Sequence, residues 1–154
     1  MIGSVDVKST PVYFYVQKTT PFYGFYPTHV PFEVTRLNIG GAMNLATGTF
    51  TAPRPGRYFF CFSGVSITSS TYGWFDVSLY LNGEHIGRGE TQTKNGNMDT
   101  YDWETYTLQS VLNLKRGDQV WLSVSSQGNT FLQDNNNRFT HFTGWLLEED
   151  VFSS

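Results

Sequence analysis

Apolar and polar residues alternate over short segments of this chain, and turn residues separate one segment from the next. A period of two is typical of strands that bury one face, whereas the 3.6-residue period of a helix is absent. The clearest segment is 75–82, where Asn82 and Gly83 form the pair that favours a type I′ hairpin. The pattern predicts an antiparallel all-β sandwich. We expect strands at 11–17, 49–52, 58–67, 75–82, 84–91, 105–114, 119–126 and 139–149, and a short strand that begins at residue 32. We expect loops at 19–31, 93–104 and 127–138.

Two of these segments are apolar or aromatic on both faces. In 58–67, Tyr58 and Phe60 alternate with Phe59, and 139–147 has the same two-sided character. A sandwich strand buries one face in the core and turns the other to solvent, where each exposed aromatic side chain forfeits ~1.5–3 kcal/mol. We therefore expect another subunit to cover these outer faces. The alternative is that loops of the same chain fold over them.

A break separates the strand at 49–52 from the strand at 58–67. Pro53 and Pro55 cannot donate a hydrogen bond to a sheet, and Gly56 tolerates backbone conformations that other residues avoid. The chain must bend here, and we expect the two strands to lie in opposite sheets.

Composition narrows the class of protein. A length of 154 residues suggests one domain, and 17% aromatic against 15% charged residues excludes a disordered chain. The net charge is −3 and the Lys and Arg residues are scattered, so we expect no nucleic-acid partner. No apolar run approaches the ~20 residues that span a bilayer, so we expect no membrane insertion. The lone Cys61 cannot form an intrachain disulfide and is expected to be a small buried hydrophobe.

Candidate catalytic chemistry is sparse. His29, His85 and His141 lie far apart and match no metal-site spacing, and no Gly-x-Ser-x-Gly nucleophile elbow occurs. We therefore expect a protein that is not an enzyme.

The segment TGTFTAPRPGRYFF at 47–60 resembles the signature of the complement C1q globular-head domain, in the wider tumour-necrosis-factor-like superfamily. Later segments resemble further blocks of that family in the same order: VSLYLNGE at 77–84, LNLKRGDQVWLSV at 112–124 and HFTGWLLEE at 141–149. The signature is matched at Thr47, Gly48, Phe50, Thr51, Ala52, Pro53, Gly56, Tyr58 and Phe60.

The resemblance implies a ten-stranded antiparallel jelly-roll sandwich that assembles as a homotrimer. We expect the domain at 11–150, between an N-terminal segment 1–10 and a C-terminal tail 151–154. In the family, the sheet that holds the first and last strands and the Gly-x-Tyr-x-Phe strand faces the three-fold axis, and many stalkless members are secreted. The first ten residues lack the apolar region of a signal peptide, so the chain is either cytosolic or the mature form of a secreted protein. The residues expected at the trimer interface are Tyr13, Tyr15, Phe59 and Phe142.

An acidic segment is the best metal candidate. Asp99, Asp102 and Glu104 place carboxylates within six positions, and calcium prefers several hard oxygen ligands. Some family members bind calcium through acidic residues just before this strand. The alternative is a solvated acidic loop without an ion.

Candidate ligand contacts lie in loops carried by the rigid sandwich. Aromatic rings can stack on sugars or anchor a protein partner, while amides, a carboxylate and a guanidinium suit sugar hydroxyls or an acidic sugar. The alternatives are packing of the rings onto the sandwich or a neighbouring subunit, and an ordinary polar loop at 133–138. The aromatic candidates are Tyr23, Phe25, Tyr26, Tyr101 and Trp103, and the polar candidates are Asp134, Asn135, Asn136 and Arg138.

Stalkless C1q-like proteins often act as lectin-like pattern-recognition molecules in innate immunity. The leading hypothesis is therefore a secreted homotrimer that binds glycans or microbial surfaces, with avidity from three copies. The alternative is a signalling or scaffolding ligand that binds a protein receptor, as adiponectin-like and cerebellin-like members do.

Overall fold

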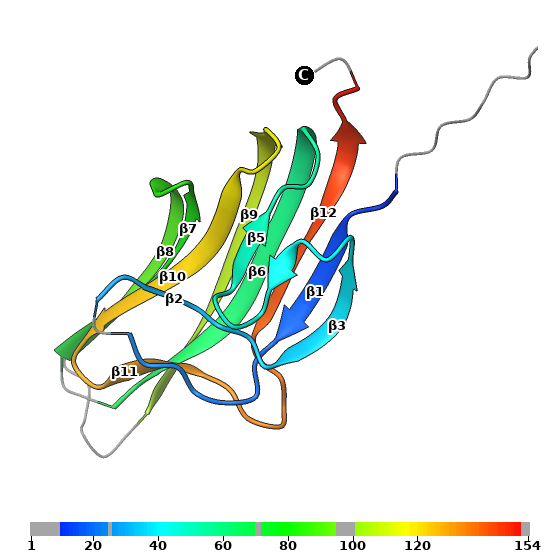
Figure 1. Cartoon of the computed structure of the whole chain (residues 1–154). Coiled ribbons are helices and arrows are strands. Elements are labelled where there is room, and N and C mark those ends of the chain that lie inside the picture. The colour runs from blue at the N-terminus through cyan, green and yellow to red at the C-terminus, as the bar shows by residue number, and fades with distance from the viewer. Residues whose placement is uncertain (1–9, 25, 70–71, 95–100, 152–154) are drawn as a thin grey trace, which may run out of the picture.

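The computed structural model describes residues 10–24, 26–69, 72–94 and 101–151. Its strands form two six-stranded antiparallel sheets that face each other, as Figure 1 shows. The strand bounds are β1 Tyr13–Gln17, β2 Thr28–His29, β3 Val34–Ile39, β4 Met43–Asn44, β5 Thr49–Thr51, β6 Gly56–Thr68, β7 Tyr72–Leu81, β8 Glu84–Lys94, β9 Asp102–Leu114, β10 Gln119–Gln127, β11 Thr130–Gln133 and β12 His141–Glu149.

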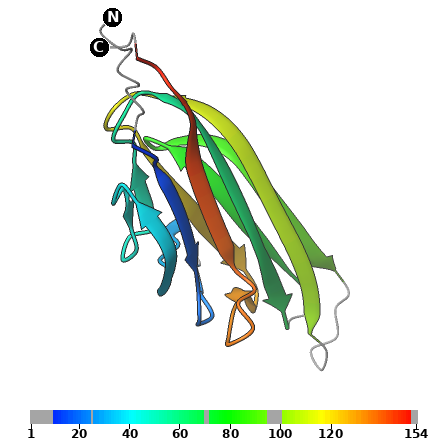
Figure 2. The ribbon, with the colours of Figure 1, turned by 90° about the vertical axis from the view of Figure 1, so that its right-hand side faces the viewer.

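We name each sheet after its central strand. The β6 sheet has the order β11-β6-β12-β1-β3, and β9 pairs with the other edge of β6. The β7 sheet has the order β4-β5-β10-β7-β8, and β2 pairs with β10. Figure 2 looks onto the outer face of the β6 sheet, where β1, β12, β6 and β9 lie side by side. The first strand, the last strand and β6 therefore share one sheet, as expected.

The break at Pro53–Gly56 joins the two sheets. β5 belongs to the β7 sheet and β6 to the β6 sheet, which confirms the predicted corner. Glycine is required at position 56 because β12 passes close to the backbone there. A Cβ atom at Gly56 would lie 2.3 Å from the Glu148 carbonyl oxygen, well inside van der Waals contact.

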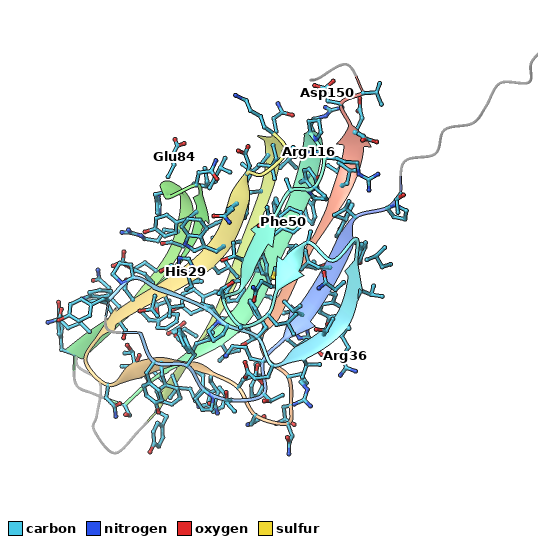
Figure 3. All side chains as sticks on the ribbon, in the orientation of Figure 1. His29, Arg36, Phe50, Glu84, Arg116 and Asp150 are labelled. Atoms are coloured by element: carbon cyan, nitrogen blue, oxygen red, sulfur yellow. The ribbon has the colours of Figure 1, made fainter. Side chains whose placement is uncertain are left out.

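Aromatic rings fill the space between the sheets. Phe50 reaches from the β7 sheet to Phe14 and Phe60 of the β6 sheet, with ring centroids 5.4 Å apart in both pairs, and Figure 3 labels it between the layers. Gly144 leaves room for this packing, because a Cβ atom there would lie 2.6 Å from the Phe14 ring. The core is thus continuous across both sheets.

Phe142 is a core residue, so its expected place at the trimer interface is wrong. It is 0% exposed, and its ring packs edge-on against Phe14 at 5.0 Å. The pairing of β12 with β6 places Phe142 directly opposite Phe62, which also points into the core. Trp145, three residues further along β12, points to the outer face instead and contacts Phe59.

The strands extend beyond several predicted limits. The Asn82-Gly83 hairpin is confirmed, with φ of 51° and 88° at its two central residues. The predicted polar loop at 127–138 contains strand β11, which pairs with the far end of β6. β9 begins at Asp102, inside the predicted loop at 93–104.

Candidate functional site

The outer face of the β6 sheet carries a row of apolar side chains that crosses five strands. In register these are Ile39 on β3, Tyr13 on β1, Trp145 on β12, Phe59 on β6 and Val111 on β9, and we call them the apolar row. The Trp145 ring stacks on Tyr13 at 5.5 Å and contacts Phe59 at 4.6 Å. The two ends of the row remain 42% exposed at Ile39 and 58% exposed at Val111. A contiguous apolar surface of this kind is typical of an association surface.

Polar side chains next to the apolar row pair with one another. The Tyr15 hydroxyl lies 2.5 Å from Nδ1 of His141, and Gln17 Nε2 donates to the same nitrogen at 3.2 Å. Arg36 Nε donates to Gln17 Oε1 at 2.7 Å. These hydrogen bonds lower the cost of covering this part of the sheet, because the paired groups lose less on leaving water.

A second cluster of rings lies at the opposite end of the same face. Trp103 on β9, Ile67 on β6 and Phe131 on β11 are aligned in register across three strands. Tyr23 packs on Phe131 at 4.8 Å, and Phe139 packs edge-on against Trp103 at 5.8 Å. We call these five residues the aromatic patch. Along β6 it lies eight residues, or about 26 Å, from the apolar row.

An ion pair holds the loop that carries Tyr23. The almost completely buried Lys18 Nζ donates to Glu33 Oε2 and to the Pro31 carbonyl, both at 2.9 Å. Glu33 Oε1 also accepts from the backbone N–H groups of Thr19 and Thr20. Burial acts to raise the pKa of Glu33, but the Thr19 N–H and Lys18 outweigh it and hold that pKa below its ordinary value. The ionised carboxylate thus fixes the start of the loop.

Asp134 holds the loop between β11 and β12 and is not a ligand contact, which corrects its predicted role. It is 1% exposed, and its carboxylate accepts from the backbone N–H groups of Asn135, Phe139 and Thr140. These bonds place Phe139 beside Trp103. Asp134 therefore shapes the loop, while its neighbours face outward.

The other predicted loop residues have different environments. Asn135 Oδ1 accepts from the Asn137 N–H, and Asn136 is exposed. Arg138 takes a left-handed φ of 56°, and its Nη1 donates to the Asn135 carbonyl at 3.1 Å. Its buried Nε has no hydrogen-bond partner among the described residues. Asn136 and Arg138 thus remain able to contact a ligand beside the aromatic patch.

Of the five predicted aromatic contacts, Tyr23 and Trp103 join one cluster. Tyr26 and Tyr101 are exposed, but neither ring contacts the patch in the described part of the chain. Phe25 lies outside the described residues.

The structure describes only two of the three carboxylates predicted to bind calcium. Asp102 and Glu104 alternate along β9 and therefore share one face of the strand. Asp99 lies outside the described residues, and no group of three acidic, His or Cys side chains that could hold a metal ion occurs within those that are described.

Sequence reasoning did not predict Ile39, Trp145 and Val111 in the apolar row. It also did not predict Ile67, Phe131 and Phe139 in the aromatic patch. The outward position of Val111 could have been predicted from the alternation along 105–114. Its neighbours Ser110 and Leu112 face inward, so Val111 between them faces outward. Phe131 was hidden because the polar residues around it predicted a loop instead of β11.

A surface depression of about 850 Å³ lies elsewhere, beside β4 and β5. Its lining includes His29, Met43, Thr47 and Gln119, and no Asp, Glu, Lys or Arg side chain contributes to it. It shares no residue with the apolar row or the aromatic patch, and it offers no carboxylate, ammonium or guanidinium group to orient a ligand.

Two facing antiparallel sheets with this strand order define a jelly-roll sandwich of the C1q type. The C1q domain family model matches residues 13–147, and the chain therefore belongs to the C1q domain family. The globular domain of zebrafish complement 1qA has the same fold, with a TM-score of 0.66 over 90% of this chain and 99% of that one. Their sequences are 20% identical, so this likeness shows the fold alone.

Curated relatives agree with the family assignment. Human complement C1q tumor necrosis factor-related protein 3 is 34% identical over 120 residues, which are 77% of this chain and 44% of that protein. Caprin-2 of Danio rerio is 29% identical over 79% of this chain and 12% of its own length. The chain thus spans less than half of these relatives. In the described residues, no helix is long and apolar enough to cross a membrane.

Proposed function

We propose that this C1q domain is a secreted homotrimeric recognition module that binds glycans or microbial surfaces. Binding takes place at the aromatic patch and the adjoining loop, and assembly takes place through the apolar row. A binding role without catalysis is part of the proposal. It is supported by the positions of His29, His85 and His141 on three different strands, with His141 on the β6 sheet and the other two on the β7 sheet.

The trimer is supported by the apolar row. Burying Trp145, Phe59 and the exposed ends of the row at a subunit interface would contribute about 25 cal/mol per Å² of apolar area. The row lies on the sheet that contains β1, β6 and β12, where the family resemblance places the three-fold axis. Tyr13, Tyr15 and Phe59 of the expected interface all lie on this face.

Glycan binding rests on one observation, the aromatic patch beside an outward-facing polar loop. Trp103 and Tyr23 are each 52% exposed, and such rings can stack on the apolar face of a sugar. Arg138 and Asn136 on the adjoining loop can donate hydrogen bonds to hydroxyls or to the carboxylate of an acidic sugar. Three copies would give avidity for repeated epitopes.

A protein receptor is the second candidate ligand. The same patch favours it, because exposed Trp and Tyr are the residues that most often anchor protein interfaces. Calcium held by Asp99, Asp102 and Glu104 remains a proposal that fits the acidic start of β9.

A glycan array, extended with intact microbial envelopes, tests the proposal. Saturable binding by the wild-type protein is expected, and Trp103→Ala and Arg138→Ala should each reduce apparent affinity at least about tenfold, or about 1.4 kcal/mol. Leu147→Ala is the matched control for Trp103→Ala, because Leu147 is also 52% exposed but lies at the far end of β12. Lys115→Ala, in the distant turn after β9, is the control for removing a positive charge. If no glycan or envelope binds, the receptor alternative replaces the glycan proposal.

A further inference from the structure

A chain of hydrogen bonds joins three strands on the outer face of the β6 sheet. Arg36 on β3 donates through Nε to Gln17 Oε1 at 2.7 Å, and Figure 3 labels Arg36 beside β3. Gln17 on β1 donates through Nε2 to Nδ1 of His141 on β12 at 3.2 Å. The Tyr15 hydroxyl also lies 2.5 Å from this nitrogen, and the Tyr15 ring stacks on the imidazole at 5.7 Å. We call these four residues the His141 cluster.

The His141 cluster fixes the protonation state of its histidine. A guanidinium group only donates hydrogen bonds, so Arg36 requires Oε1 of Gln17 as its acceptor and turns Nε2 toward His141. An amide nitrogen also only donates, and Nδ1 of His141 must therefore offer a lone pair. In this arrangement His141 is neutral and carries its single proton on Nε2.

Protonation of His141 breaks this arrangement. A proton on Nδ1 would face the amide donor of Gln17, a residue that is only 4% exposed. The amide cannot turn over, because its nitrogen would then face the Arg36 guanidinium, which also only donates. Tyr15 can adapt, since a hydroxyl accepts as well as donates. The protonated form is therefore destabilised by a buried donor that lacks an acceptor.

No negative charge compensates a protonated His141. Within the described residues, His141 forms no ion pair with a carboxylate. The one carboxylate close to this end of β1 belongs to Glu33, which is already paired with Lys18. The outward positions of β9 at this level are Thr107 and Gln109, which do not titrate. The other charged or titratable groups on the packed segments are Tyr13 and Tyr15 on β1, Arg36 on β3, Cys61 on β6 and Arg138 in the preceding loop.

The His141 cluster lies on the same face as the apolar row. His141 is four residues from Trp145, or about 13 Å along β12. Tyr15 is two residues from Tyr13 of the row, and alternate residues of a strand share a face. His141 and Tyr15 are still partly exposed in a single copy. A second copy on this face would take water away from the imidazole, which disfavours its charged form.

We infer that His141 is a pH switch for assembly, in which the neutral imidazole favours the trimer and the protonated imidazolium favours separate copies. The inference rests on the proposed trimer. Histidine side chains change charge between about pH 5 and 8, so the switch operates in this range. Three copies bring three such charges, each near an Arg36, to one assembled face, where like charges repel. Acid would thereby also lower avidity for repeated epitopes.

The test is sedimentation of the whole chain over a range of protein concentrations at pH 7.5 and at pH 5.0. The wild-type protein should be trimeric at pH 7.5, and the concentration of half-assembly should rise at least about tenfold at pH 5.0. Glu33 stays ionised over this range, because its pKa is held below its ordinary value of 4.5. Nitrogen NMR of the histidines at pH 7.5 should find Nδ1 of His141 without a proton.

Two variants test the role of the cluster independently. His141→Gln removes the titratable group and should be equally assembled at both pH values. Gln17→Glu supplies a carboxylate that can accept from both Arg36 and a protonated His141. It should therefore keep the trimer at pH 5.0, and it decides the matter if His141→Gln does not fold.

The matched controls lie on the other sheet. His29→Gln and His85→Gln each remove a histidine from the β7 sheet and should keep the full response of wild type to acid. Asp76→Asn should also keep it. Burial raises the pKa of this carboxyl group on β7 to about 6, so it titrates in the same range.

The outcomes separate the switch from the trimer. A wild-type protein that is equally trimeric at both pH values overturns the switch and leaves the trimer intact. A wild-type protein that is monomeric at pH 7.5 overturns both. A His141→Gln variant that still dissociates in acid, a control that loses the response, or a proton on Nδ1 at pH 7.5 overturns the assignment of the switch to His141.

Discussion

The outer faces of the two sheets share one fold but differ in chemistry. The β6 sheet presents the apolar row, whose five side chains come from five strands and leave Val111 more than half exposed. The β7 sheet instead presents Asp76 and small serine side chains on its outer face, with Arg88 and Glu90 on the neighbouring strand β8. Each strand pair is built on the same alternation, so the difference lies entirely in which side chains occupy the outward positions.

This difference separates assembly from recognition. An apolar outer face gains free energy when a second copy covers it, whereas a face with a buried carboxylate loses free energy when it is covered without a matching donor. The β6 sheet is therefore suited to association between copies, and the β7 sheet is suited to remain in solvent.

The largest expected effect is the loss of the trimer when a charge is placed in the apolar row. Trp145→Glu places a charge between Tyr13 and Phe59, and an unpaired charge in an interface costs about 3–5 kcal/mol. Sedimentation in dilute buffer should show a trimer for wild type and a monomer for the variant. Trp121→Glu, which makes the same change on the β7 sheet, should remain trimeric. A trimeric Trp145→Glu variant, or a monomeric wild type, would contradict the assignment of the row.

The next effect concerns Asp76. Its folded pKa of about 6 lies above its ordinary value of 3.8, so the folded state binds the proton more tightly than the unfolded state. The contribution of this group to the free energy of unfolding is therefore largest below about pH 4 and falls as pH rises through 6, by at most about 3 kcal/mol. Asp76→Asn should gain stability relative to wild type between pH 4.5 and pH 7.5 in urea unfolding. A constant difference between the two proteins across this range would be inconsistent with the raised pKa.

A smaller effect is expected at Lys18. Lys18→Met removes the charged hydrogen bond to Glu33 and should lower the free energy of unfolding by about 1.5–3 kcal/mol. Because the folded pKa of Glu33 is lowered, its contribution is present above its ordinary value of 4.5 and is lost as pH falls through the folded pKa. The variant should therefore lose less stability than wild type on acidification below pH 4.5. It should stay trimeric, because the pair lies away from the apolar row; Lys115→Met is the control.

The smallest effect is that of calcium. If Asp99, Asp102 and Glu104 hold an ion, calcium at ten times its dissociation constant should stabilise the fold by about 1.4 kcal/mol. A chelator should then lower the melting temperature of wild type but not of a Glu104→Gln variant. Identical melting curves with and without chelator would remove calcium from the proposal.

The fold was largely predictable from local patterns. Alternation at 75–82 and the Asn82-Gly83 pair both predicted the hairpin, because a hairpin depends on neighbouring residues alone. The corner at Pro53–Gly56 was predictable for the same reason, since proline removes backbone donors wherever the chain goes. β11 was not predictable, because its polar surroundings resemble a loop and its strand character comes from pairing with β6.

The candidate sites were less predictable. Tyr23 and Trp103 were predicted as ligand contacts separately, but Phe131 and Phe139, which join them into one patch, were not. Asp134 was placed among the ligand contacts because its residue type suits hydrogen bonding. Only its burial against three backbone N–H groups shows that it stabilises the loop.

The sequence alone determined the all-β sandwich, the corner between the sheets and the two-sided strands, because these follow from residue type and period along the chain. The tertiary structure decided which side of each two-sided strand meets the core. Phe142 and Trp145 are three residues apart on one strand, and pairing with β6 buries the first and turns the second outward. The tertiary structure also decided that Asp76 on β7 lies opposite Glu90 on the adjacent strand β8, because the register between strands is a property of the whole sheet.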